Sequence, residues 1–170
     1  HELQSQLYLR ICIATKKMKY FSINLYRKML NCAITEGMNR EEFMNLPTPI
    51  NRINDFQAIP AEEFFSLHEL LDEKLGPGFA VRVGQQMKIE DYGVLGLSWR
   101  TCSWAGEIFE RSERYFKLLS NTFVWQIKEK GDISCVYLNR EAHRRGLELS
   151  TEASLSATVV VLQAMTEKKI

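Results

Sequence analysis

The chain has 170 residues, of which 45% are hydrophobic and 25% charged, and its formal net charge is +1. This length and composition predict one globular domain, and the small net charge gives no electrostatic indication of nucleic-acid binding. Four widely separated cysteines, without a C-x-x-C pair, favour buried thiols in a reduced, cytoplasmic protein. No apolar run approaches the roughly 20 residues of a membrane-spanning helix, and no signal-peptide pattern begins the chain.

The sequence gives the weakest indication of structure for residues 1–20. Apolar and other residues alternate loosely at positions 7–14, which is compatible with a strand, and lysines then interrupt the pattern. The first clear helix follows, since Ser22 can cap it and Gly37 can end it. Asn39, with Glu42 three residues later, predicts a short second helix that begins with a capping box. The next segment, up to residue 59, is expected to be a connection.

A third helix is predicted from Pro60 to the Gly76-Pro77-Gly78 sequence, because apolar residues recur between them at helical spacing. His68 lies on the apolar stripe of this helix. A single histidine in that position is interpreted as a core residue, with a haem or metal ligand as the competing hypothesis. Residues 79–87 fit a short helix better than a strand.

The stretch from Tyr92 to Ser120 organises the rest of the chain. It begins with a short apolar helix that contains Gly93 and Gly96, breaks at residues 101–103, and restarts as an amphipathic helix with one charged face. The two glycines are predicted to let the short helix approach a neighbouring element closely.

After this stretch the apolar period changes to two. Residues 123–128 and 133–138 alternate on either side of Lys130-Gly131-Asp132, which predicts a β-hairpin. The basic cluster at residues 143–145 is interpreted as a solvated loop.

A last helix is expected to begin with Ser150 or Thr151 as its cap. Its predicted apolar stripe consists of Leu155, Thr158, Val159, Leu162 and Met165.

Motifs of catalysis and cofactor binding do not occur in the sequence. It contains no G-x-G-x-x-G or P-loop pattern, no H-E-x-x-H and no G-x-S-x-G. The three histidines are too dispersed to indicate a zinc site. We therefore expect a non-enzyme that carries no cofactor.

The chain contains four segments in a characteristic order: GFAVRVG at 78–84, GVLGL at 93–97, AGEIF at 105–109 and RYFKLL at 114–119. This order resembles the N-terminal sensor domain of AraC-type bacterial transcription regulators, and the resemblance covers about residues 20–168. Trp104 stands where that family usually has threonine, so we expect Ser103 to cap the helix that follows.

Together these patterns predict an α+β fold, mostly helical with a small antiparallel β-sheet. Residues 21–170 are expected to form a single effector-sensing and dimerisation domain, preceded by the uncertain segment 1–20. The resemblance implies that an unknown small molecule shifts the population of conformations and so changes how DNA-binding halves are presented. The helix-turn-helix domain of such regulators is absent from this chain, so DNA is expected as a partner only through that separate C-terminal domain.

Homodimer formation is also expected from the resemblance, and a dimerisation module without a small-molecule ligand is the alternative function. A concave apolar pocket would favour sensing, whereas a flat exposed apolar face would favour dimerisation.

The predicted ligand site surrounds the break in the central stretch. Tyr92, Trp99 and Trp104 lie around the break, Trp125 lies on the first hairpin strand, and Arg100 is the only charged residue between Tyr92 and Gly106. If the break faces the hairpin, the aromatic side chains wall a cavity in which Arg100 meets an anionic group. Otherwise the tryptophans fill the core or an interface, and Arg100 points to water.

Overall fold

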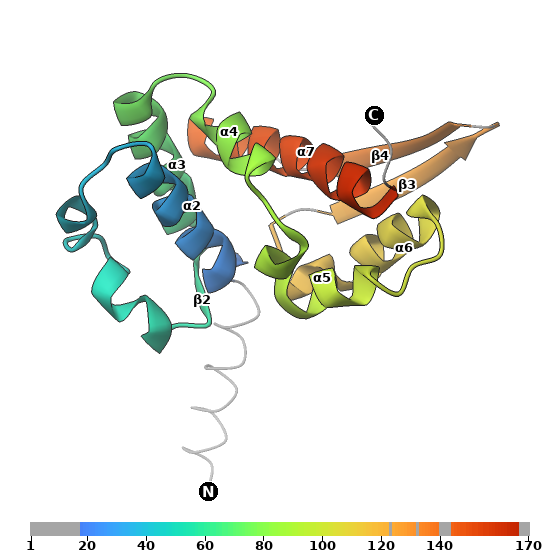
Figure 1. Ribbon diagram of the computed structural model, residues 1–170, viewed down its shortest axis with the longest axis horizontal. Helices are drawn as coiled ribbons and strands as arrows, with labels where there is room; N and C mark the ends of the chain where they lie inside the picture. The colour runs from blue at the N-terminus through green and yellow to red at the C-terminus, as the bar shows by residue number, and fades with distance from the viewer. Residues whose placement is uncertain (1–17, 123, 132, 140–143, 167–170) are drawn as a thin grey trace, which may run out of the picture.

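A computed structural model describes residues 18–122, 124–131, 133–139 and 144–166 of the chain. This part is mostly helical and contains two antiparallel sheets of two strands each (Figure 1). The predicted α+β fold with little strand is therefore confirmed. The possible strand at residues 7–14 lies outside the described residues. Within the described ranges, no helix is long and apolar enough to cross a membrane.

The first half of the described chain forms a helical unit around one hydrophobic cluster. Its elements are β1 (Tyr20–Ser22), α2 (Ile23–Thr35), η1 (Arg40–Phe43), η2 (Ile50–Asp55), β2 (Ala58–Pro60), α3 (Ala61–Leu75) and α4 (Phe79–Gln85). Strands β1 and β2 pair antiparallel, with Phe21 opposite Ile59. Phe21 then stacks on Phe64 of α3 with 4.0 Å between the ring centroids, so the small sheet is joined directly to the core.

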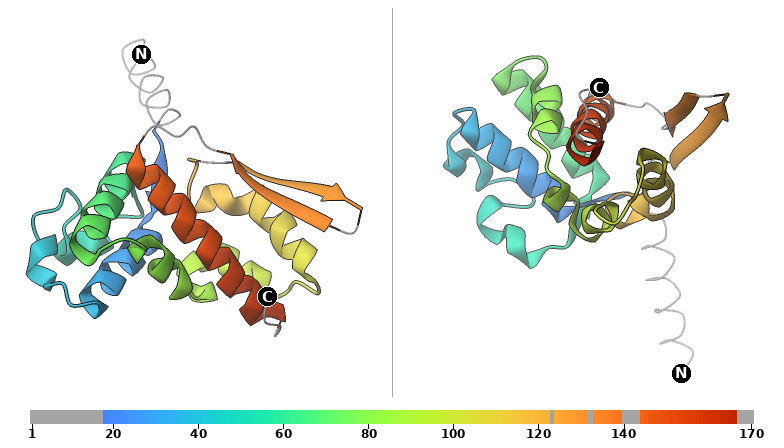
Figure 2. Two further views of the ribbon diagram at one scale, coloured as in Figure 1. Left: turned by 90° about the horizontal axis from the view of Figure 1, so that it is seen from above. Right: turned by 45° about the vertical axis from the view of Figure 1, so that its right-hand side comes forward.

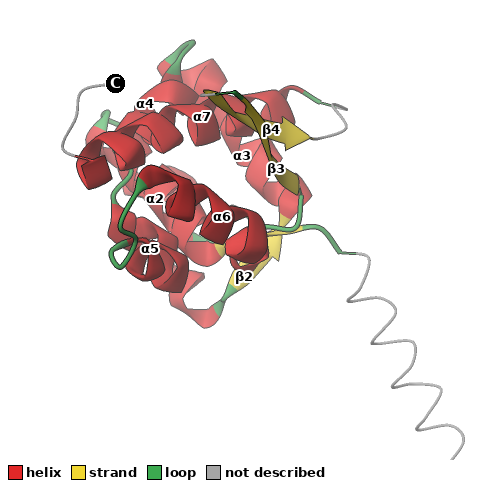
Figure 3. Cartoon of the chain, turned by 90° about the vertical axis from the view of Figure 1, so that its right-hand side faces the viewer, coloured by secondary structure: helices red, strands yellow, loops and turns green. Residues whose placement is uncertain are grey.

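The second half contains shorter helices and a hairpin around a second hydrophobic cluster. Its elements are η3 (Ile89–Tyr92), α5 (Gly93–Trp99), α6 (Ala105–Tyr115), η4 (Phe116–Leu118), β3 (Val124–Lys130) and β4 (Ile133–Asn139). The hairpin pairs Val124 with Asn139 and Lys130 with Ile133, which confirms the predicted strand pair. The strands form only short segments among the helices (Figure 3).

The last helix, α7 (Arg145–Thr166), joins the two halves. It packs against α3 and α4 on one side and against α6 on the other (Figure 2). Leu147 near its start belongs to the first hydrophobic cluster, whereas Ala157 and Val161 belong to the second. Any change in the position of α7 therefore affects both clusters.

Several helix boundaries agree with the sequence patterns. The Ser22 hydroxyl accepts a hydrogen bond from the Asn24 backbone N–H (3.3 Å) and so caps α2. The Asn39 side chain accepts from the Glu41 N–H, and the Glu42 carboxylate accepts from the Asn39 N–H, both at 3.1 Å. This reciprocal pair is the predicted capping box, although the element that follows it is a 3₁₀ turn.

The predicted start of the last helix was wrong. Helix α7 begins at Arg145, and the Ser150 and Thr151 hydroxyls both donate to the Leu147 carbonyl inside the helix. The predicted stripe is correct only in part: Leu155 and Val159 are exposed, whereas Leu162 and Met165 pack against the second hydrophobic cluster. The buried residues of α7 are Gly146, Leu147, Leu149, Ser150, Ala157 and Val161.

Close helix packing explains the error about the stripe, since small residues let backbones approach. A Cβ atom on Gly84 of α4 would lie 2.4 Å from the Ala153 carbonyl oxygen and 2.9 Å from the Ala157 nitrogen of α7. Two helices this close have no room for leucine or valine between them. A search for large apolar residues therefore misses the small residues by which α7 packs against α4.

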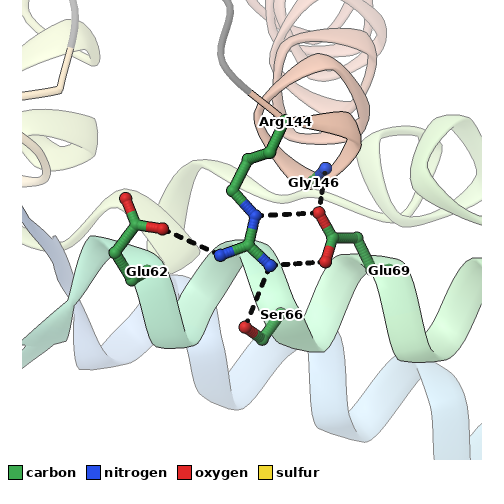
Figure 4. Close-up of polar contacts among 5 residues, drawn as sticks. All are labelled: Glu62, Ser66, Glu69, Arg144 and Gly146. Atoms are coloured by element: carbon green, nitrogen blue, oxygen red, sulfur yellow. Dashed lines mark hydrogen bonds and ion pairs between the residues drawn. The ribbon is translucent and has the colours of Figure 1, made fainter.

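The basic cluster before α7 is only partly a solvated loop. Residue 143 lies outside the described residues, and Arg145 is exposed. Arg144 instead forms ion pairs with Glu69 and Glu62 of α3 (Figure 4). The sequence interpretation failed for Arg144 because its carboxylate partners lie more than 70 positions earlier in the chain.

The cap of α6 also differs from the prediction. Ser103 does not cap the helix through its hydroxyl; its backbone N–H donates to the Glu107 carboxylate (2.5 Å). The first helical residues follow Trp104, which makes no side-chain capping hydrogen bond.

The two glycines of α5 have different roles. A Cβ atom on Gly96 would lie 1.9 Å from the Ile89 carbonyl oxygen, so this glycine does permit the predicted close approach between α5 and η3. A Cβ atom on Gly93 would meet only ordinary van der Waals contact, at 3.5 Å from Asn24. Gly93 is instead favoured because the backbone φ at this position is +57°, a value that other residues rarely adopt.

Replacing Gly96 with leucine should destabilise the protein by about 1–3 kcal/mol, since the side chain would force α5 away from the Ile89 carbonyl. Thermal unfolding measures the change. Val94→Leu, at an exposed position of the same helix, is the matched control and should leave the melting temperature unchanged. An equal effect of the two substitutions would contradict the packing argument.

Candidate functional site

A cavity lies where the two hydrophobic clusters meet, against α7. It is partly open to solvent and lined mostly by apolar side chains. The first half of the chain contributes apolar side chains from β1, α2, α3 and α4. The second half contributes Tyr92, Trp99, Ile108, Phe109 and Phe116. A molecule in this cavity would contact both halves at once.

Helix α7 forms one wall of the cavity with residues that recur every three or four positions, which places them on one helical face. These residues are Ser150, Ala153, Ser154, Ala157, Thr158, Val161 and Leu162. Small side chains predominate, and they leave open the space that larger side chains would fill.

The hydroxyl groups of the wall are already engaged as donors. Ser150 donates to the Leu147 carbonyl (2.9 Å), Ser154 to the Ser150 carbonyl and Thr158 to the Ser154 carbonyl (both 2.8 Å). On the opposite side, Ser112 donates to the Ile108 carbonyl (2.7 Å). Since a hydroxyl has one hydrogen, these groups retain chiefly acceptor capacity toward a ligand.

Tyr92 and Trp99 form an aromatic pair in the second half of the lining. Their ring centroids are 4.8 Å apart at an interplanar angle of 57°, and both side chains are buried. Burial, together with the neighbouring Asp91 carboxylate, raises the pKa of the Tyr92 phenol, which therefore stays neutral. The Trp99 indole Nε1 is buried and has no hydrogen-bond partner in the described part of the chain.

His68 of α3 also lines the cavity. Its side chain is buried, and its ring contacts the Phe64 ring edge-to-face with a centroid distance of 4.9 Å. It is thus a core residue that borders the cavity. Among the described residues, no group of three or more His, Cys, Asp or Glu side chains is placed to hold a metal ion.

Of the residues predicted for the ligand site whose side chains the structure describes, Tyr92 and Trp99 line the cavity. Arg100 is 55% exposed and forms an ion pair with Glu90, outside the cavity lining. Arg100 and Trp99 therefore do not border one cavity, and Arg100 points to solvent as the alternative interpretation expected. Successive residues of a helix point about 100° apart, so the inward position of Trp99 turns Arg100 toward solvent.

Trp104 is likewise outside the cavity lining and is 57% exposed. Its ring covers Gly106, where a Cβ atom would come within 1.7 Å of a ring carbon. Trp125 lies on β3 opposite Leu138, and its side chain is outside the described part of the structure.

The wall that α7 contributes was not predicted from the sequence. The available signal was a run of small residues, Ser150, Ala153, Ser154, Ala157 and Thr158, at helical spacing. Such a run indicates a helix face that either packs closely or borders a space.

The comparison with protein families agrees with this architecture. A family model described as the N-terminal arabinose-binding domain of AraC transcription regulators matches residues 50–170, which is more than half of the chain. The chain belongs to this family, and the resemblance noted in its sequence is confirmed. The family is a regulatory domain of a transcription regulator rather than an enzyme. No curated protein sequence matches the chain.

Replacing Arg100 with alanine should leave the melting temperature unchanged, because ion pairs exposed to solvent contribute little to stability. It should also leave unchanged the affinity of any ligand that binds in the cavity. Differential scanning fluorimetry with and without ligand measures both quantities. If a ligand stabilises the wild type but not Arg100→Ala, then Arg100 takes part in binding that ligand, as the sequence predicted.

Proposed function

We propose that this domain senses a small-molecule effector in the cavity between its two hydrophobic clusters. The observation that carries the proposal is the lining of that cavity: mostly apolar side chains with a few buried polar groups, as is usual for small-molecule sites. Membership in a family of regulatory domains supports the same role. The effector signal would then be passed to a separate DNA-binding domain.

The proposed mechanism is a shift between conformations. Because an effector would contact both halves of the chain and α7, it would favour the arrangement in which all three are packed together. The difference in affinity between the two arrangements sets the largest change that the effector can cause. This domain would act in the bacterial cytoplasm, where the DNA target of the complete regulator lies.

The experiment that tests this function is a thermal-shift screen of metabolites with a blocked-cavity variant. A ligand that binds only the folded state raises the melting temperature. Ser154→Phe would place a ring in the cavity, whereas Leu155→Phe would add the same ring at the next, exposed position. We expect Leu155→Phe to keep the ligand response and Ser154→Phe to lose it. Equal responses in the two variants would refute the cavity as the effector site.

This chain alone should not bind operator DNA specifically. Its net charge is +1, and its sequence contains no helix-turn-helix pattern. An electrophoretic mobility-shift assay at physiological salt checks this, with the full-length regulator as the positive control. If the 170-residue chain retards operator DNA specifically, the proposal that a separate domain binds the DNA is wrong.

Dimerisation without a ligand is the second candidate function, and one observation favours it. Val94 and Leu97 lie one turn apart on α5 and are 74% and 56% exposed. Light scattering after size exclusion, comparing the wild type with Leu97→Glu, tests whether this face holds two copies together. If it does, α5 would link the cavity to the dimer, because its buried residue Trp99 lines the cavity.

A further inference from the structure

The lining of the cavity restricts the charge of its effector. None of the described residues that line it is Asp, Glu, Lys or Arg. A charged ligand group would therefore lose its hydration without gaining an opposite charge. Of the side chains in this lining, His68 alone could carry a positive charge to pair with an anion.

The lining also disfavours a sugar, even though the family description names arabinose. Each hydroxyl of a pentose donates one hydrogen bond and accepts others. The serine and threonine hydroxyls of the lining already donate to backbone carbonyls, as with Ser112 and Ser154. A bound sugar would thus find acceptors for its hydroxyl hydrogens but few donors for its oxygens.

Trp99 supplies one donor that a ligand could use. Its side chain is 3% exposed and lines the cavity, and its indole Nε1 has no hydrogen-bond partner within the described residues. Buried donors in folded proteins almost always have a partner, and an indole N–H can only donate. A ligand atom that accepts this hydrogen bond would satisfy the group.

We propose that the effector is an uncharged, mostly apolar molecule whose carbonyl oxygen accepts a hydrogen bond from the Trp99 indole N–H. A neutral ketone, ester, lactone or amide has this chemistry. The apolar part of the molecule would lie against the aromatic and aliphatic side chains of both halves. This inference rests on the proposed function, since it names the chemistry of the same cavity.

Four probes test separately the effects of a carbonyl acceptor, a negative charge and a sugar on binding. Acetophenone carries a ring and a neutral carbonyl, and ethylbenzene has nearly the same shape without an acceptor. Benzoate adds a charge, and L-arabinose represents the sugar. Binding is measured by titration in ¹H–¹⁵N spectra of protein labelled at its tryptophans, of which there are three. Trp99→Phe identifies the Trp99 indole signal, and Ser154→Phe shows which binding occurs in the cavity.

We expect acetophenone to bind about three to ten times more tightly than ethylbenzene, the range expected for one neutral hydrogen bond. It should also move the Trp99 indole resonance. In Trp99→Phe, which keeps an aromatic ring without the N–H group, this preference should disappear while ethylbenzene still binds. Thermal unfolding of the variant without ligand confirms that it is folded.

The results distinguish an error in the proposed effector chemistry from an error in the proposed function. If benzoate or arabinose binds more tightly than acetophenone and Ser154→Phe blocks that binding, the cavity is an effector site but its chemistry is not the one proposed. Equal affinities of acetophenone and ethylbenzene would refute the role of Trp99. If none of the probes binds, the inference is wrong, and the metabolite screen alone decides the proposed function.

Discussion

Replacing Gly84 with alanine should destabilise the protein, although the same substitution at an exposed helical position would stabilise it by about 1 kcal/mol. The reason is the contact between α4 and α7. The added methyl group would lie 2.4 Å from the Ala153 carbonyl oxygen and 2.6 Å from the Ser156 Cβ atom, so the two helices must separate. We expect a net loss of about 1–3 kcal/mol for alanine and a larger loss for leucine.

Separation of these helices should also weaken interactions beyond the clash itself. The Ser156 hydroxyl donates to the Val81 carbonyl (3.0 Å) across the same interface and would lose this partner. Because α7 forms a wall of the cavity, ligand affinity should fall together with stability. Gly96→Leu, which acts away from α7, should lower stability without breaking the Ser156 hydrogen bond.

Urea unfolding of Gly84→Ala, Gly84→Leu and the wild type measures the free energies. Gln85→Ala is the matched control, since Gln85 is the next residue of α4 and is exposed. The control should leave stability unchanged or raise it slightly. A stabilising effect of Gly84→Ala would mean that α7 does not approach α4 as closely as the structure indicates.

The elements that the sequence predicted well are those defined by local chemistry. Ser22 caps α2, and Asn39 and Glu42 form a capping box, because these side chains accept hydrogen bonds from backbone N–H groups two or three positions away. The hairpin follows from a period of two on either side of a tight turn. Such interactions are encoded in a few consecutive residues, so a single sequence reveals them.

The elements that the sequence predicted poorly depend on distant partners. The start of α7 was misplaced because Arg144 is held by side chains of α3, and part of its buried face was missed because Gly84 brings α4 close to it. The candidate site shares this limit. Tyr92 and Trp99 were selected for their large aromatic side chains, and both line the cavity. Arg100 was selected only for its charge, but the direction of its side chain depends on the helix that carries it.

Replacing Glu69 with glutamine should loosen the start of α7. The Glu69 carboxylate accepts hydrogen bonds from the Arg144 guanidinium and from the Gly146 backbone N–H (2.7 Å), and it so fixes the residues where α7 begins (Figure 4). Arg144 also donates to Glu62 (2.8 Å) and Ser66 (3.1 Å), so one side chain joins three positions of α3. The hydrogen bonds therefore anchor α7 at the end where it meets the first hydrophobic cluster.

The expected loss for Glu69→Gln is about 1–2 kcal/mol. Hydrogen bonds to charged groups contribute more than neutral ones, but the Glu69 and Arg144 side chains are 33% and 26% exposed, so solvent screening reduces the contribution of the pair. Arg144→Lys should have a similar effect, because lysine keeps the charge but cannot form the two-pronged contact. Arg145→Lys, at the exposed neighbouring position, is the control and should change little.

The pH dependence of stability distinguishes this anchor from a simple packing contact. The hydrogen bond from Arg144 holds the pKa of the Glu69 carboxyl below its ordinary value of 4.5; partial desolvation opposes this effect, and the Gly146 N–H adds to it. The unfolded chain thus takes up the proton at a higher pH than the folded chain. The contribution of the anchor is present above pH 4.5 and is lost as the pH falls through the folded-state pKa. Urea unfolding from about pH 7 to about pH 3 should therefore show a smaller acid-induced loss in Glu69→Gln than in the wild type. If both proteins lose the same stability over this range, the carboxylate of Glu69 does not hold α7 in place.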